Sequence, residues 1–153
     1  MIIEFFGLSN TGKSVLKREL EKKGYKVSRT EKVSKTRKFF LFVRHFILNP
    51  LSTIYLFKKL NSNSIKIPLS SKKKSAIKKM RNSYLTGVFS KYEYLKNKKE
   101  NIFMDEFSFQ SLFMILQKKS NESEIKKILK KLPKSNYLFL FEGKKEWRHK
   151  AYQ

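Results

Sequence analysis

The chain has 153 residues and a formal net charge of +24, from 36 Lys and Arg against 12 Asp and Glu. A chain of this length is expected to form a single domain, residues 1–153, and its 40% apolar content is typical of a globular protein. It has no Cys and two His, which excludes disulfide scaffolds and cysteine nucleophiles and disfavours a centre built on histidine. The composition is compatible with a reducing, cytoplasmic location.

A predicted strand, Ile2 to Phe6, runs directly into Gly-Leu-Ser-Asn-Thr-Gly-Lys-Ser, from Gly7 to Ser14. This segment fits G-x-x-x-x-G-K-[ST] at every fixed position, and a predicted helix, from about Gly12 to Gly24, follows it. Loops of this kind point their N–H groups at a phosphate, and the positive end of the helix dipole also favours binding of that anion. We therefore predict a site for a nucleoside triphosphate.

The residues predicted to bind the nucleotide are Gly7, Asn10, Thr11, Gly12, Lys13 and Ser14. Lys13, expected in a solvated loop, would reach the β- and γ-phosphates, and the hydroxyl of Ser14 would bind Mg²⁺. Next, residues 25–28 form a short predicted strand, so that the crossover should be right-handed and the two strands parallel.

The segment from Phe39 to Leu60 is strongly apolar and is predicted to form two helices that meet at Asn49-Pro50. A membrane span is disfavoured because Arg44 and His45 lie near its middle. An interfacial amphipathic anchor is a minor alternative. In a nucleotide kinase this region would wall the acceptor pocket, which makes Arg44 and His45 candidate acceptor contacts.

Residues 61–71 are rich in turn formers and separate this segment from a helix predicted over about 72–97. A third predicted strand, 101–104, then ends in the pair Asp105-Glu106. P-loop proteins have the carboxylate that organises Mg²⁺ at the carboxyl end of such a strand. Asp105 is therefore predicted to bind Mg²⁺ together with Ser14. The alternative is that both acids merely begin the next helix, where the dipole favours them.

Two further helices are predicted, one containing Phe109 to Leu116 and one beginning at Asn121, which has capping-box spacing with Glu124. Tyr137 to Phe141 shows no polar alternation, which is typical of a buried parallel strand. A basic run, residues 144–150, follows.

Together these segments resemble the thymidylate-kinase-like branch of the P-loop kinases. The resemblance rests on Gly7 to Ser14, on Lys23 to Val27 with Arg29-Thr30-Glu31 after it, on Asp105, and on Arg148 shortly after the fourth strand. It implies a three-layer α/β P-loop NTPase fold with a parallel sheet in the order 2-3-1-4, ATP and Mg²⁺ as the phosphoryl donor, and a basic lid that contains Arg148.

The sequence departs from that family at two places. Asp105-Glu106 stands where thymidylate kinases have Asp-Arg, and no Pro follows Glu31. These differences point to an acceptor other than thymidylate, such as a nucleoside, a sugar or another hydroxyl compound.

The leading hypothesis is an ATP-dependent phosphotransferase in which Lys13, Asp105, Glu106 and Arg148 are the catalytic residues. Glu106 would orient or deprotonate the acceptor hydroxyl. The alternatives are an NTPase whose basic surface holds nucleic acid, and an ATP-binding protein without turnover. We expect the chain to lack the fifth strand usual in such kinases and to self-associate through the exposed sheet edge. Nucleic acid or an anionic membrane is a further partner class that the dispersed lysines do not favour.

Overall fold

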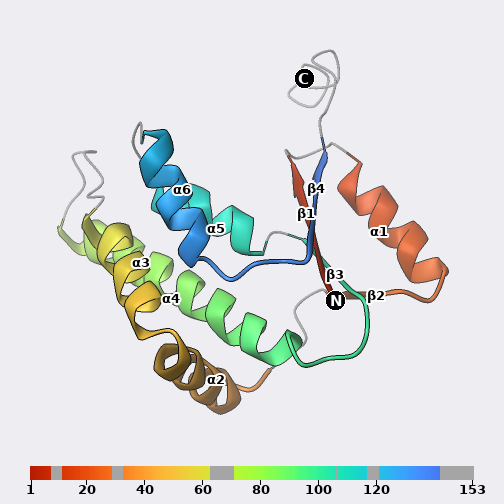
Figure 1. The fold of residues 1–153 in the computed structure, drawn as a ribbon, viewed down its shortest axis with the longest axis horizontal. Coiled ribbons are helices and arrows are strands. Elements are labelled where there is room, and N and C mark those ends of the chain that lie inside the picture. The colour runs from red at the N-terminus through yellow and green to blue at the C-terminus, as the bar shows by residue number, and fades with distance from the viewer. Residues whose placement is uncertain (8–11, 29–32, 63–70, 106, 117–120, 142–153) are drawn as a thin grey trace. The chain divides into compact units, whose positions relative to one another are not determined.

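The computed structural model describes residues 1–7, 12–28, 33–62, 71–105, 107–116 and 121–141. It has the predicted α/β composition, and its chain divides into two compact units (Figure 1). The sheet unit comprises Met1–Lys32, Leu95–Phe107 and Ser135–Gln153, and the helical unit comprises Val33–Tyr94 and Ser108–Lys134. Each unit is described by itself below.

The described part of the sheet unit holds four parallel strands and one helix. They are β1 (Ile2–Gly7), α1 (Lys13–Lys22), β2 (Lys26–Ser28), β3 (Ile102–Asp105) and β4 (Tyr137–Phe141). The strands lie in the order β2-β3-β1-β4, so β1 has a neighbour on each side. Because all the pairings are parallel, the carboxyl ends of the four strands lie at one edge of the sheet.

Phe5 of β1 is the central aromatic side chain of the sheet unit. It is almost fully buried, and its ring lies 5.5–6.1 Å from the rings of Phe103, Phe139 and Phe141 on the neighbouring strands. These contacts fit an apolar β1 paired on both sides and help to hold β3 and β4 in register with it.

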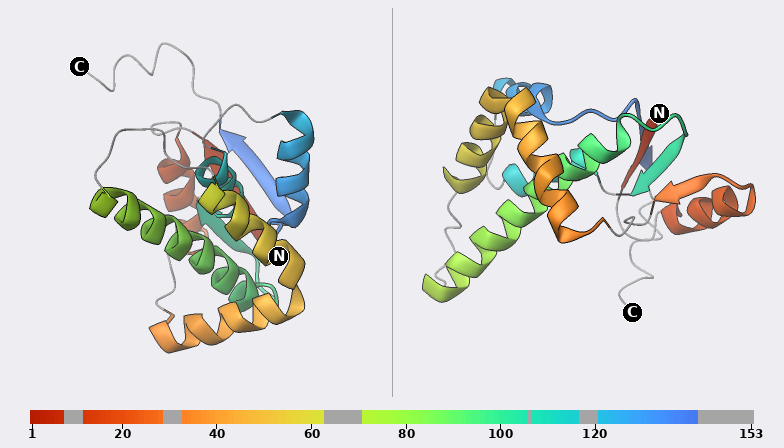
Figure 2. Two further views of the ribbon diagram at one scale, coloured as in Figure 1. Left: turned by 90° about the vertical axis from the view of Figure 1, so that its left-hand side faces the viewer. Right: turned by 90° about the horizontal axis from the view of Figure 1, so that it is seen from below.

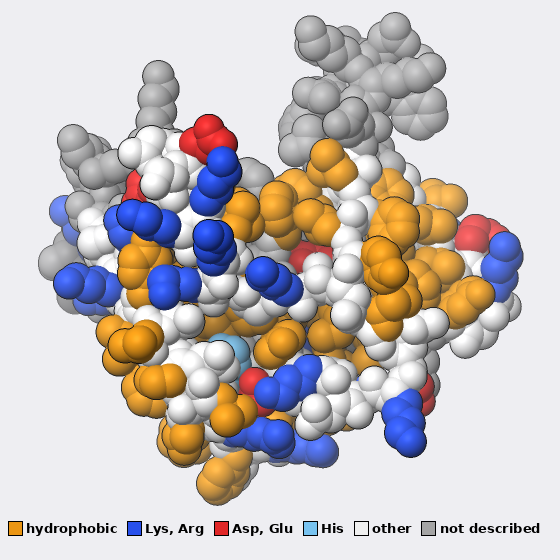
Figure 3. Space-filling view, in the orientation of Figure 1, with side chains coloured by type: hydrophobic (Ala, Val, Ile, Leu, Met, Phe, Trp, Pro, Cys, Tyr) orange, Lys and Arg blue, Asp and Glu red, His pale blue; other side chains and the backbone are white. Residues whose placement is uncertain are grey.

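The structure corrects the prediction that β4 is buried. Its side chains from Tyr137 to Leu140 are 43–58% exposed, although the strand pairs with β1 along its whole length. Figure 3 shows this hydrophobic surface over β4. The unalternating apolar run correctly predicted a parallel strand, but hydropathy alone does not tell whether another element covers it.

The helical unit consists of α2 (Lys35–Leu48), α3 (Pro50–Ser62), α4 (Ser71–Leu95), α5 (Ser108–Ile115) and α6 (Glu122–Lys131). The last residue of α4, Leu95, belongs to the sheet unit. Its core is built from side chains of α3, α4, α5 and α6 together with the residue that follows α6: Leu56, Leu60, Leu85, Phe89, Leu112, Ile115, Ile128 and Leu132. The helices therefore bury apolar faces against one another.

The predicted break between α2 and α3 is confirmed. Pro50 is the first residue of α3, where a missing N–H costs no helical hydrogen bond, and the two helix axes are bent by 109° (Figure 2). Among the described residues no single helix is long and apolar enough to cross a membrane, although the bent pair reaches that composition jointly.

The start of α6 also agrees with the prediction. The side-chain oxygen of Asn121 accepts a hydrogen bond of 2.8 Å from the backbone N–H of Glu124. The carboxylate of Glu124 accepts a hydrogen bond of 2.7 Å from Lys59 on α3, which ties α3 to α6.

Candidate nucleotide-binding site

Two glycines frame the predicted phosphate-binding loop, and each position requires glycine for a different reason. A Cβ on Gly7 would lie 2.5 Å from the carbonyl oxygen of Phe141, so only glycine allows β1 to approach the end of β4 this closely. Gly12, the N-cap of α1, has φ +87°, in the left-handed region that favours glycine. Asn10 and Thr11, the other predicted loop contacts, lie outside the described residues.

Lys13 is the first residue of α1, and its side chain returns toward the end of β1. Its Nζ donates a hydrogen bond to the carbonyl oxygen of Gly7, and the residue is only 9% exposed. The prediction that Lys13 lies in a solvated loop is therefore wrong. Because side chains at the start of a helix tilt toward its N-terminus, the ammonium group reaches back to the mouth of the loop.

The N-terminus of α1 keeps its positive character in the described structure. Gly12 has no side chain to cap the helix, and no acid lies in the first turn of α1. Ser14 is exposed there. A helix end of this kind favours an anion, and a serine hydroxyl at its second position is available to a ligand or a metal ion.

Asp105 is the last residue of β3. It pairs in register with Phe5, and β1 extends beyond Phe5 to Gly7, so the end of β3 and the start of the loop lie at the same edge of the sheet. The backbone of Asp105 belongs to the strand and α5 begins only at Ser108, so Asp105 does not begin that helix. Glu106 and Arg148 lie outside the described residues.

Glu4 is a buried carboxylate that the sequence analysis missed. It lies on β1 with an exposure of 0%, pairs in register with Met104, and its Oε1 accepts a hydrogen bond of 3.0 Å from the backbone N–H of Phe107. It thereby ties the central strand to Phe107, shortly after the end of β3. The signal that could have found it is the single acid inside the apolar run Ile2 to Phe6, because unpaired carboxylates are rarely buried.

Lys17 is a second residue that sequence reasoning missed. It is as buried as Lys13, whereas Val15 and Leu16 are exposed, so α1 turns basic rather than apolar side chains inward. The signal was the spacing of four residues between the two lysines, which puts them on one face about 6 Å apart along the axis. The buried face of α1 therefore carries two positive charges near the loop.

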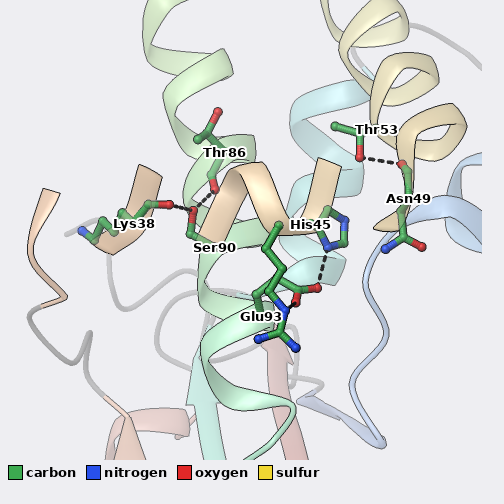
Figure 4. A network of polar contacts seen from close by, with 8 residues as sticks. Lys38, His45, Asn49, Thr53, Thr86, Ser90 and Glu93 are labelled. Carbon is green, nitrogen blue, oxygen red and sulfur yellow. Dashed lines mark hydrogen bonds and ion pairs between the residues drawn. The ribbon is translucent and has the colours of Figure 1, made fainter. Parts of the chain in front are cut away.

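Arg44 and His45, the candidate acceptor contacts, have partners within the helical unit. The Nδ1 of His45 lies 3.0 Å from Oε1 of Glu93 (Figure 4). The ring of His45 stacks on that of Phe89 at a centroid distance of 4.5 Å. The Nε of Arg44 lies 3.5 Å from the other oxygen of the same carboxylate. Glu93 is fully buried and was also missed. Their role toward an acceptor stays a prediction.

Within the described ranges, His, Asp and Glu do not gather in groups of three that could hold a metal ion. A hydroxyl and one carboxylate are instead the hard oxygen ligands that Mg²⁺ accepts when the phosphates of a nucleotide supply its other ligands.

Comparison of the chain with protein-family models, with curated proteins and with solved structures found no match.

Proposed function

We propose that the chain is an ATP-dependent phosphotransferase with a P-loop NTPase fold, similar to thymidylate-like kinases and acting on a small hydroxyl acceptor. One observation carries the proposal: Lys13 contacts Gly7 at the end of β1, and the parallel pairing of β1 with β3 puts Gly7 and Asp105 at the same edge of the sheet. The strand order β2-β3-β1-β4 supports it, since β1, which leads into the predicted loop, is a central strand with a neighbour on each side.

Each group then has a distinct task. Lys13 would exchange the carbonyl oxygen of Gly7 for phosphate oxygens, and Ser14 with Asp105 would hold Mg²⁺. The ion would neutralise charge on the transferred phosphoryl group. Glu106 would orient the acceptor hydroxyl and Arg148 would bring a further positive charge. Positioning and electrostatics would supply most of the rate, as is usual for phosphoryl transfer.

Calorimetric titration of ATP with and without Mg²⁺ tests the nucleotide site. Lys13→Ala should weaken ATP binding about tenfold or more because a charge-assisted contact is lost. Lys22→Ala is the matched control, since it removes the same charge from the exposed last turn of α1 and should leave binding unchanged. Equal ATP affinity of folded Lys13→Ala and the parent would reject the site.

The two acids separate metal binding from acceptor activation. Asp105→Asn should lower both Mg²⁺-dependent ATP binding and turnover, because the missing charge acts in the ground state and in the transition state. Glu106→Gln should keep ATP affinity within about threefold and reduce turnover by about 10². Wild-type turnover by Glu106→Gln would remove Glu106 from the mechanism.

The acceptor can be found by a screen that detects phosphorylated products. ATP is offered with nucleosides, nucleoside monophosphates and sugars, and the released ADP and the product are both measured. Turnover that rises with one acceptor supports a kinase. ATP hydrolysis that no acceptor stimulates, but that nucleic acid does, would favour the NTPase alternative instead.

A further inference from the structure

An exposed apolar patch covers the outer side of α2 and the beginning of α3. Its six members are each 52–79% exposed: Phe39, Phe40, Ile47, Leu48, Leu51 and Ile54. Figure 3 shows hydrophobic side chains over α2 with Lys and Arg side chains beside them. Single exposed apolar residues need no explanation, but six large ones on two consecutive helices indicate an interaction surface.

The other side of α2 is fixed against α4, so the patch cannot turn inward. His45 and Glu93 form the buried pair described above, and the hydroxyl of Ser90 donates a hydrogen bond of 2.8 Å to the carbonyl oxygen of Lys38 (Figure 4). The ring of Phe42 stacks on that of Phe89 at 6.4 Å. These contacts set the rotation of α2 about its axis, and the patch faces outward as a result.

The charge around the patch has one sign over a long stretch of sequence. Residues 32–92 contain 15 Lys and Arg and no Asp or Glu. Lys35, Arg37 and Lys38 lie in the first turn of α2, directly before Phe39 and Phe40. A second copy of the chain would bring another net charge of +24 to the same surface, so the field opposes a homodimer here and favours an anionic partner.

We infer that this patch binds the surface of an anionic lipid bilayer. The apolar side chains enter the boundary between headgroups and acyl chains, while the lysines and arginines of α2 extend to the lipid phosphates. Lipid contacts only the outer side of the two helices, because Leu56 and Leu60 of α3 belong to the core of the helical unit. The bend of 109° and this occupied inner side fit a pair that lies on the membrane.

Cosedimentation of the whole chain with vesicles tests the inference. Vesicles of phosphatidylcholine alone are compared with vesicles of phosphatidylcholine and phosphatidylserine, at low and high salt. Each Lys or Arg near an anionic surface raises the partition coefficient by about fivefold, so Lys35→Gln/Lys38→Gln should weaken binding by about 25-fold. Phe40→Ser/Ile47→Ser should weaken it by about tenfold or more, because apolar area no longer enters the membrane.

Matched variants of the helical unit at positions outside the patch serve as controls. Lys126→Gln/Lys127→Gln on α6 removes the same charge, and Met80→Ser removes one apolar side chain of similar exposure from α4. Both controls should bind like the parent. Circular dichroism of each variant shows that it is folded.

Three results would overturn the inference. The first is no preference of the parent for vesicles with phosphatidylserine. The second is an equal loss in the patch variants and their controls, which would indicate attraction by net charge alone. The third is a parent dimer in light scattering that Phe40→Ser/Ile47→Ser converts to a monomer, because the patch would then be covered by a second copy.

Discussion

The buried carboxylate of Glu4 gives the sharpest prediction about stability. Glu4→Ala removes the carboxylate that accepts a hydrogen bond from the backbone N–H of Phe107, a residue only 1% exposed. A hydrogen bond to a charged group contributes about 1.5–3 kcal/mol, and the one buried methylene group that is lost adds about 0.8 kcal/mol. We expect the free energy of unfolding to fall by about 3 kcal/mol, since losing a buried charge offsets part of this sum.

Glu4→Gln is the matched variant, because a glutamine side chain keeps an oxygen in the same place. Its free energy of unfolding should stay within about 1 kcal/mol of the parent. Urea titration gives both values, and the Tm of Glu4→Ala should fall by roughly 6–12 °C for a chain of this size. Amide exchange at Phe107 should accelerate in Glu4→Ala and not in Glu4→Gln.

Two outcomes would refute this reasoning. If Glu4→Ala were as stable as the parent, the hydrogen bond to Phe107 would contribute nothing. If Glu4→Gln were as unstable as Glu4→Ala, the negative charge and not the acceptor oxygen would be what the fold needs. Glu4 ties β1 to Phe107, two residues after Asp105. If the chain is the proposed phosphotransferase, Glu4→Ala should therefore also reduce turnover in protein that is still folded at the assay temperature.

Two further predictions follow from local geometry. Gly7→Ala should lower the free energy of unfolding by about 2 kcal/mol or more, because its Cβ would meet the carbonyl oxygen of Phe141. Gly24→Ala should lower it by only about 1 kcal/mol, because Gly24 has φ +80° but open space around it. Equal losses in urea titration would contradict this. The hydrogen bond with Glu124 raises the pKa of Lys59 above 10.5, against a smaller opposing effect of burial. The stabilisation by this pair is therefore complete at neutral pH and is lost as the pH rises through the raised pKa of the folded state. The difference in unfolding free energy between the parent and Glu124→Gln should accordingly shrink above pH 10.5. A difference that stays constant there would contradict the prediction.

Local signals in the sequence were sufficient for much of the backbone. Apolar runs next to glycine and acidic residues predicted parallel strands, Asn49-Pro50 predicted the break between two helices, and Asn121 predicted the start of α6. Each of these signals acts within a few residues of the position it determines. The α/β class is therefore readable without any long-range information.

The features that the sequence did not predict share a different cause. Each depends on which distant part of the chain packs against the residue. The side of α1 that faces inward is set by its neighbours, so Lys17 is buried and Val15 exposed against their ordinary preferences. The partner of His45 lies 48 residues away. The exposure of β4 depends on coverage, which hydropathy does not encode.

The pairing of β1 also has a consequence for synthesis on the ribosome. β1 leaves the ribosome before its two neighbours in the sheet, because β3 and β4 lie far behind it in the sequence. The segment that emerges between them, α2 to α4, can form its local helices at once, whereas β1 has two open edges until residues 102–141 have been made. Until then β1 exposes unpaired backbone groups on both edges, which is the condition under which strands of nascent chains associate wrongly, and the sheet can be completed only after β3 and β4 have been made.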